Sequence, residues 1–216
     1  YPMIKRTFAL LFAFILLAST TVFAQEKALH GKIPPKNGLW LEELDLSKMT
    51  QGWKKPQAGK SVIGFPMTLG GEEYIHGIGT SAGSQFAIDL KGVATAFMAM
   101  VGVDDETQGK GSVTFEVWLD GKLVSDSGVV KGGGKPTLLS ADLTGGKQLV
   151  LLVSDAGDGS QGDHADWAGA TLILNASDSQ RPEAVALAPD TSKPELALGD
   201  GPEPAIHGPR ITGATP

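Results

Sequence analysis

An alternating run of apolar side chains followed by a tight-turn pair constrains the fold of this chain more than any other feature. Residues 113–119 have the sequence VTFEVWL, in which Val113, Phe115 and Val117 recur with the period of a β-strand that buries one face. Asp120-Gly121 follows, and this pair is typical of the two-residue turn of a β-hairpin. Residues 122–124 again resemble a strand, so the sequence predicts an antiparallel hairpin.

Short strand-like segments of the same kind recur along the central part of the chain. They are separated by turns rich in glycine, and no segment between them predicts an amphipathic helix of more than about two turns. Residues 39–46 are ambiguous, because their apolar spacing fits a strand or a short helix. The pattern predicts an all-β fold, specifically an antiparallel β-sandwich. The further strands are expected at residues 61–69, 74–78, 85–90, 94–103, 137–143, 148–153 and 168–174.

The two ends of the chain differ in composition from this central part. Residues 1–24 combine Lys5 and Arg6 with a short apolar run and a final Ala24, which predicts a cleaved signal peptide and a secreted or periplasmic protein. An uncleaved membrane anchor is the alternative. Residues 25–38 form a lead-in to the central part. Residues 176–208 are rich in proline and predict an unpacked linker, and residues 209–216 suggest the start of a following module.

Charge and cysteine content exclude several classes of protein. The formal net charge is −6, which does not imply a basic surface for nucleic acid or for an anionic membrane. The sequence has no cysteine, so no disulfide stabilises the fold. The domain at residues 39–175 therefore depends on apolar burial, with or without a structural metal ion.

The stretch from Asp155 to Trp167 concentrates polar groups among glycines and is the leading candidate for a binding site. Aromatic faces stack on sugar rings, while carboxylates and imidazoles bond to sugar hydroxyls. Trp167, His164, Asp166 and Asp163 supply these groups within five residues. For Trp167 the structural alternative is packing in the core, and for His164 and Asp166 it is a local cap in which Asp166 orients His164.

A second acidic cluster, Asp104-Asp105-Glu106, follows the strand expected at residues 94–103. Adjacent carboxylates repel one another unless a cation or backbone amides offset their charge, and Ca²⁺ prefers such oxygen ligands. A solvated acidic turn is the alternative, and the spacing at residues 155–166 does not match an EF-hand. The candidate ligands of a structural calcium ion are Asp105, Glu106, Asp155 and Asp158.

The segment Gly79-Thr80-Ser81-Ala82-Gly83 matches the G-x-S-x-G pattern of α/β-hydrolase nucleophiles. That arrangement requires a helix directly after the serine, whereas residues 85–90 predict a strand. The sequence therefore predicts that this chain is not itself an enzyme.

A series of short motifs, in the same order and spacing, resembles the NPCBM domains, a family of carbohydrate-binding modules. The resemblance spans residues 39–175, almost the whole of the predicted sandwich. Family members usually carry His and Asn where this chain has Ser81 and Gly83, and these departures are expected to change or abolish sugar binding. The motifs are Gly52-Trp53, Gly59-Lys60-Ser61, Asp120-Gly121, Ser127-Gly128-Val129 and residues 70–82, 101–106, 111–117 and 155–167.

The resemblance implies a galactose-binding-like jelly roll whose loop end binds a glycan and often holds a structural calcium ion. It also implies a covalently attached glycoside hydrolase of the α-galactosidase-like type, which the module targets to galactose-type glycans. The alternative is a structural or protein-interaction sandwich with a calcium-stabilised acidic loop and no sugar binding. The expected sugar-binding residues are His164, Asp166, Trp167, Asp163, Asp104, Asp105 and Ser81.

Overall fold

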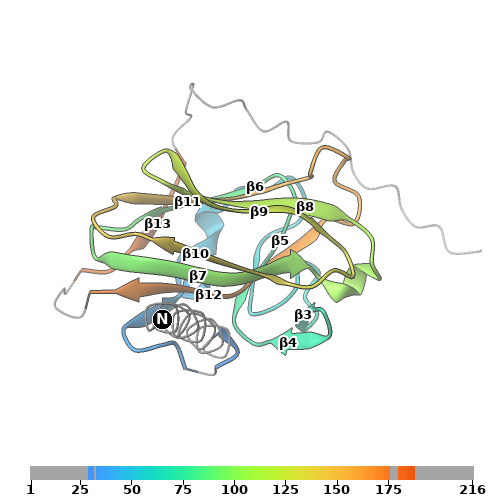
Figure 1. Cartoon of the computed structure of the whole chain (residues 1–216), viewed down its shortest axis with the longest axis horizontal. Coiled ribbons are helices and arrows are strands. Elements are labelled where there is room, and N and C mark those ends of the chain that lie inside the picture. The colour runs from blue at the N-terminus through green and yellow to red at the C-terminus, as the bar shows by residue number, and fades with distance from the viewer. Residues whose placement is uncertain (1–28, 32, 176–179, 188–216) are drawn as a thin grey trace, which may run out of the picture.

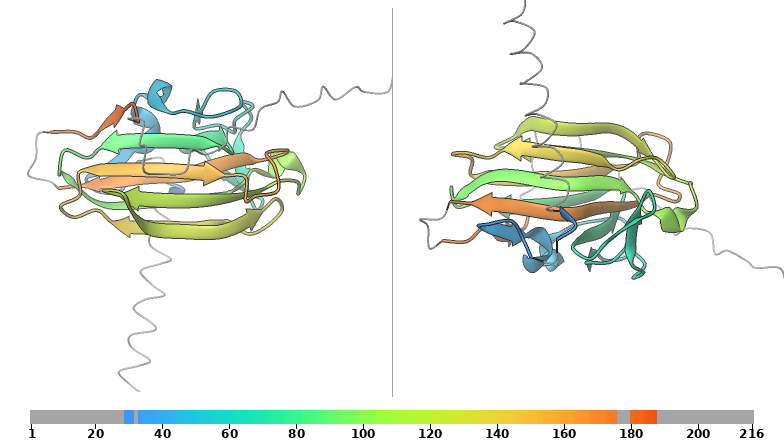
Figure 2. Two further views of the ribbon diagram at one scale, coloured as in Figure 1. Left: turned by 90° about the horizontal axis from the view of Figure 1, so that it is seen from above. Right: turned by 60° about the horizontal axis from the view of Figure 1, so that its bottom comes forward.

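Two antiparallel β-sheets stacked face to face form the body of the protein in the computed structural model, which describes residues 29–31, 33–175 and 180–187 (Figure 1). The first sheet has the strand order β10-β7-β12-β5-β2, with β1 also paired to β12, and the second has the order β13-β6-β11-β8-β9. The long strands of both sheets run roughly along one axis (Figure 2), so the all-β sandwich prediction is confirmed. The strands are β1 (Gly38–Trp40), β2 (Gln57–Ala58), β3 (Met67–Leu69), β4 (Glu72–Tyr74), β5 (Gly77–Ser81), β6 (Ser84–Asp89), β7 (Ala94–Val103), β8 (Ser112–Leu119), β9 (Lys122–Lys131), β10 (Thr137–Asp142), β11 (Gln148–Ser154), β12 (His164–Leu174) and β13 (Glu183–Val185), and the short 3₁₀ helices are η1 (Leu41–Glu43), η2 (Leu46–Lys48) and η3 (Asp105–Thr107).

The predicted hairpin is present as β8 and β9, and it shows how the alternating sequence builds the core. Val113, Phe115 and Val117 of β8 are all buried between the sheets. Asp120 and Gly121 have φ angles of 49° and 77°, as a type I′ turn requires at both central positions. The turn therefore matches the twist of the two strands and pairs Leu119 with Lys122.

The structure differs from the predicted strands at four places. Residues 74–78, expected as one strand, contain the end of β4, a bend at residues 75–76 and the start of β5. Residues 61–66 form a loop, because the Ser61 amide donates to the carbonyl of Phe65 at 2.9 Å and closes the chain on itself, so the strand β3 begins only at Met67. β12 begins at His164, four residues before the expected strand at 168–174. The ambiguous segment 39–46 divides between the end of β1, η1 and the start of η2.

The outer face of the first sheet is covered by the lead-in segment and by the β3-β4 hairpin. Met98 and Met100 of β7 point away from the main core and pack with Leu29 and Tyr74 in a second apolar cluster. The ring of His30 stacks on Tyr74 with 4.1 Å between centroids. The described part of the lead-in is therefore packed on the sandwich.

Residues 183–187 extend the edge of the second sheet, although the sequence assigned them to an unpacked linker, and for these residues that prediction is wrong. β13 pairs antiparallel with β6, and Val185 and Leu187 pack on an apolar stripe made of Ala87, Val150 and Leu152. The predicted signal peptide at 1–24 and the expected module start at 209–216 lie outside the described residues. None of the helices in the described ranges is long and apolar enough to cross a membrane.

The packing of β13 predicts that Val185→Asp destabilises the protein whereas Ala186→Asp does not. Val185 is half-buried over the stripe, and its neighbour Ala186 is exposed. A carboxylate at 185 loses apolar burial and is partly desolvated, so we expect the free energy of unfolding to fall by about 1–2 kcal/mol. Urea denaturation of both variants measures this difference. Equal midpoints for the two variants would contradict a packed β13.

Candidate functional site

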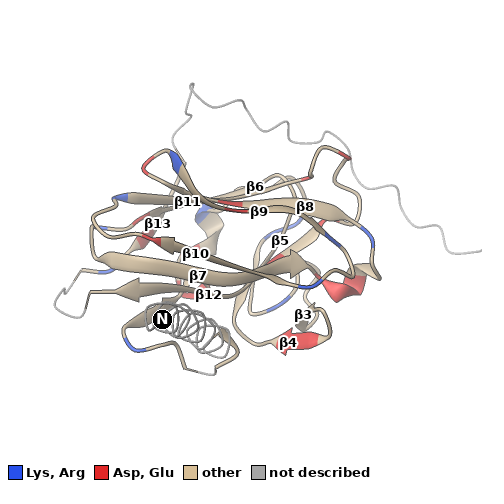
Figure 3. Ribbon diagram, viewed as in Figure 1, with Lys and Arg blue, Asp and Glu red and all other residues tan. Residues whose placement is uncertain are grey.

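Four segments that are distant in sequence meet at the end of the sandwich where β7 ends and β12 begins. η3 follows β7 directly, and its carboxylates form the acidic end of the molecule in Figure 3. Ser81 ends β5 at the same edge, because β5 and β12 pair with Ser81 opposite His164. The loop that contains Trp53 lies over this edge, as its contacts with both residues show.

A half-buried indole and an imidazole form the centre of this site. The ring of Trp53 stacks on the ring of His164, with 5.1 Å between centroids and 25° between planes. The Trp53 carbonyl accepts hydrogen bonds from Gln51 Nε2 at 2.8 Å and from Ser81 Oγ at 3.2 Å, which hold the loop in place. Lys54 Nζ lies 4.9 Å from the centre of the Trp53 ring. The indole therefore contacts both the imidazole stacked on it and a cation over its ring.

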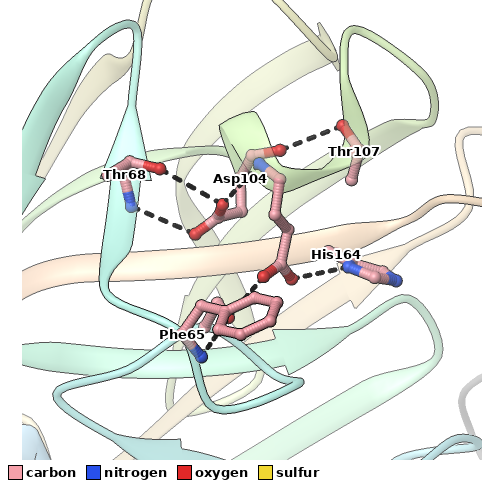
Figure 4. A network of polar contacts seen from close by, with 7 residues as sticks. Phe65, Thr68, Asp104, Thr107 and His164 are labelled. Atoms are coloured by element: carbon pink, nitrogen blue, oxygen red, sulfur yellow. Dashed lines mark hydrogen bonds and ion pairs between the residues drawn. The ribbon is translucent and has the colours of Figure 1, made fainter.

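The orientation of His164 is determined by a carboxylate on η3. His164 Nδ1 lies 2.6 Å from Glu106 Oε1, and the other oxygen of Glu106 accepts a hydrogen bond from Ser61 Oγ at 2.6 Å. The side chain of His164 is 15% exposed, and its second nitrogen, Nε2, points away from this network (Figure 4). A ring held in this way keeps Nε2 available for an incoming hydroxyl group.

The other two acids of the second cluster support η3 from behind. Asp104 is fully buried and accepts hydrogen bonds from the amides of Glu106 at 2.8 Å and Thr68 at 3.1 Å. Backbone amides thus offset its charge, which is the usual role of an aspartate at a helix N-terminus. The prediction that Asp104 contacts a sugar is wrong, because its carboxylate is enclosed. Asp105 is half-buried and accepts from the amides of Gly70 and Gly71, and its sugar contact stays a prediction.

Trp167 lies in the core and not at the site, so the prediction that its ring stacks on a sugar is wrong. It is 1% exposed and makes edge-to-face contacts with Phe115 and Phe97, with centroids 4.9 Å and 6.0 Å apart. The reason is the early start of β12. From His164 onward, successive side chains of this strand point to opposite faces of the sheet. Trp167 therefore faces the core, and His164 lies at the strand end, where it reaches Glu106.

Two more predicted sugar ligands are buried acids, and enclosure rules out direct sugar contact for both. Asp163 Oδ1 accepts from the Ser112 amide at 2.9 Å, and the pKa of Asp163 is raised to about 7, chiefly by burial and also by the nearby carboxylate of Asp158. Asp166 is 0% exposed, and burial, with the charge of Asp104 as the next cause, raises its pKa well above the usual range. Neither carboxyl oxygen of Asp166 has a hydrogen-bond partner in the structure. A protonated Asp166 has a hydrogen to donate to Asp104, which supplies this partner.

The four candidate calcium ligands do not come together. Within the described ranges no group of three or more His, Asp or Glu side chains is placed to hold a metal ion. Asp105 bonds to backbone amides of the β3-β4 turn, Glu106 bonds to Ser61 and His164, Asp155 bonds to the Gly157 amide, and Asp158 accepts from Ser112 Oγ. These side chains do not fit one shared ion, and the calcium ion itself stays a prediction.

Ser81 is not placed as a hydrolase nucleophile. It is buried, its hydroxyl donates to the Trp53 carbonyl, and the chain continues after Gly83 into the strand β6 and not into a helix. The expected strand after the G-x-S-x-G pattern is confirmed, which agrees with a non-catalytic protein.

Trp53 was not among the residues expected to bind sugar, and Glu106 was expected as a metal ligand and as a neighbour of the sugar. Gly52-Trp53 was one motif of the family resemblance, but a single aromatic residue in an irregular segment carries no periodic signal. The contact between Glu106 and His164 joins positions 58 residues apart in the sequence. A local pattern cannot reveal such a pair.

Comparison with known proteins agrees with this fold. Residues 37–173 match the NPCBM/NEW2 domain family. A "Putative endo-alpha-N-acetylgalactosaminidase" of Renibacterium salmoninarum is 29% identical over 172 residues, which are 76% of this chain and 11% of that protein. The chain therefore spans about a tenth of the length of this relative.

Two solved structures of carbohydrate-binding modules are similar to the sandwich. The CBM51 module from Clostridium perfringens GH95, in complex with methyl-galactose, matches with a TM-score of 0.59 and 34% identity over 62% of this chain and 99% of that chain. A structure of CBM51-2 with GlcNAc and INT domains from Clostridium perfringens ZmpB matches with a TM-score of 0.60 and 28% identity over 63% of this chain and 31% of that chain. Because the family match covers nearly the whole sandwich from β1 to β12, the chain belongs to the NPCBM/NEW2 domain family.

Proposed function

We propose that this chain binds galactose-type glycans at the rim formed by Trp53, His164 and Glu106, and that it targets an attached glycoside hydrolase to them. The family and the fold are those of non-catalytic carbohydrate-binding modules. The observation that carries the proposal is the stack of Trp53 on His164, with His164 oriented by Glu106 at 2.6 Å.

The chemistry of this rim suits a sugar. A pyranose ring has apolar patches of C–H groups that pack on an aromatic face, and hydroxyl groups that bond to oriented donors and acceptors. Trp53 supplies the face, and His164 Nε2 supplies a directed polar atom beside it. Galactose is supported by the methyl-galactose complex of the similar module and by the name of the Renibacterium relative, a putative endo-alpha-N-acetylgalactosaminidase. Attachment to a hydrolase and export from the cell are part of the same proposal.

The departures from the family pattern do not remove this rim. Ser81, where the family usually has His, donates to the Trp53 carbonyl and so supports the loop. The rim offers few polar and aromatic groups to a sugar. We therefore expect modest affinity, which tethering to a catalytic domain would raise through effective concentration.

Trp53→Ala is expected to weaken sugar binding at least tenfold, because it removes the aromatic side chain of the rim, while Glu106 still orients His164. Isothermal titration with methyl galactoside, N-acetylgalactosamine and N-acetylglucosamine, with calcium and with a chelator, measures this loss. Trp118→Ala is the matched control, since Trp118 is also half-buried but lies on β8 next to the hairpin turn, away from the site. A wild-type protein that binds none of these sugars in either buffer would overturn the proposal.

A further inference from the structure

One large aromatic side chain near the site is exposed and has no role in the core. Phe65 is 59% exposed, and its neighbour Ile63 is 38% exposed. Single exposed apolar residues are common on protein surfaces and need no explanation by themselves. Phe65 differs because hydrogen bonds hold its loop in place, and one residue of these hydrogen bonds, Ser61, also bonds to Glu106 of the candidate site.

The loop at residues 61–66 is held by three hydrogen bonds to one buried serine. The Ser61 amide donates to the Phe65 carbonyl at 2.9 Å, the Gly64 amide donates to the Ser61 carbonyl at 2.8 Å, and the Phe65 amide donates to Ser61 Oγ at 3.2 Å. Pro66 follows and further restricts the backbone of Phe65. The backbone of this aromatic residue is thus fixed before any ligand arrives, and binding costs it little conformational entropy.

The same serine joins the loop to the residues that orient the imidazole. Ser61 Oγ donates to Glu106 Oε2 at 2.6 Å, and Glu106 Oε1 lies 2.6 Å from His164 Nδ1. Figure 4 shows Phe65 and His164 at the two ends of this network. The polar Ser61–Glu106 pair thus connects Phe65 to the Trp53–His164 stack.

Two aromatic surfaces that flank a polar centre favour a ligand that is longer than one sugar ring. Trp53 and its stacked imidazole offer a surface for a single pyranose. Phe65 offers a second apolar surface that a neighbouring sugar of the same glycan would reach.

We propose that Phe65 forms a second subsite, which contacts the sugar linked to the one held at Trp53. The module would then bind oligosaccharides more tightly than monosaccharides. The inference rests on the proposed function, because it assigns the first sugar to the Trp53–His164 rim. Beyond that function, it assigns a ligand of at least two linked sugars and names Phe65 as the residue that distinguishes such a ligand from a single sugar.

The experiment compares two kinds of probe on the wild-type protein, on two Phe65 variants and on one control variant. Methyl galactoside occupies the first subsite alone, and a panel of galactose-terminated trisaccharides that differ in linkage reaches both. We expect the wild-type protein to bind at least one trisaccharide about three- to tenfold more tightly than methyl galactoside, as one added aromatic contact predicts. Phe65→Ala is expected to remove this gain and leave methyl galactoside binding unchanged, and Phe65→Tyr, which keeps the ring, is expected to retain it.

The outcomes separate this inference from the proposed function. If methyl galactoside and the trisaccharides all fail to bind the wild-type protein, the proposed function fails. If methyl galactoside binds but no trisaccharide binds more tightly, or if Phe65→Ala keeps the trisaccharide gain, only the second subsite is refuted. Equal weakening of both probes in Phe65→Ala would also refute it, because Phe65 would then only support the loop. Val129→Ala, an exposed apolar position on β9, is the control for unspecific effects.

Discussion

Replacement of Trp167 by Ala is expected to lower the free energy of unfolding by about 3–5 kcal/mol, which is the usual cost of deleting a buried aromatic side chain. Trp167 is among the largest fully buried side chains, and it contacts Phe97 of β7 and Phe115 of β8, which belong to different sheets. Its removal leaves a cavity between the two layers. Denaturant unfolding followed by circular dichroism measures the loss.

The control for Trp167→Ala distinguishes a core role from a sugar-binding role. Trp118→Ala removes a half-buried indole from the outer face of β8, and we expect it to cost clearly less. Trp167→Phe keeps most of the volume and is expected to recover much of the stability. A Trp167→Ala protein that unfolds like the wild type but has lost sugar binding would contradict the assignment of Trp167 to the core.

Asp163→Asn is expected to make the protein more stable than the wild type at pH 8, with little difference near pH 4. The pKa of Asp163 is about 7 in the folded protein, mainly through burial, against an ordinary value of 3.8. As pH rises from about 4 to 7, the unfolded chain loses this proton while the folded protein keeps it, so the stability of the wild type falls over that interval. Above pH 7 the folded protein contains a buried carboxylate.

The expected gain for Asp163→Asn at pH 8 is on the order of 2–4 kcal/mol, given about 1.4 kcal/mol for each unit of pKa change. The Asn carbonyl can still accept the hydrogen bond from the Ser112 amide, so the variant preserves the contact at 2.9 Å. Thermal unfolding at pH 4, 6 and 8 gives the difference between variant and wild type, which cancels the titration of all other groups. Asp142→Asn is the control, because Asp142 is exposed and its pKa is lowered by the Thr144 amide. A difference that does not grow with pH would show that Asp163 titrates normally.

Local patterns in the sequence predicted much of the fold. The alternation in β8 and the Asp120-Gly121 turn are patterns that span only a few residues, and both depend only on residues that are neighbours in the sequence. The same holds for β7, which matches the expected strand at 94–103. The resemblance at residues 39–175 was confirmed by the family match.

The site could be predicted only in part. His164 was identified because polar and aromatic residues cluster around it in the sequence. The same clustering wrongly suggested that Trp167, Asp166 and Asp163 share its exposure. Polar composition shows that a segment carries chemistry, but it does not show which side chains the strand turns inward.

By itself, the sequence determined the class of fold, the position of the hairpin, the family and the neighbourhood of the site. Only the tertiary structure decided that β12 begins at His164, because its pairing with β5 and β7 extends that far. It also brought together Trp53, Glu106 and His164, and placed β13 on the apolar stripe of the second sheet. The physical reason is that hydrogen-bond periodicity and turn chemistry act between near neighbours in the chain, whereas burial and side-chain contacts depend on segments that meet only after the sheets have stacked.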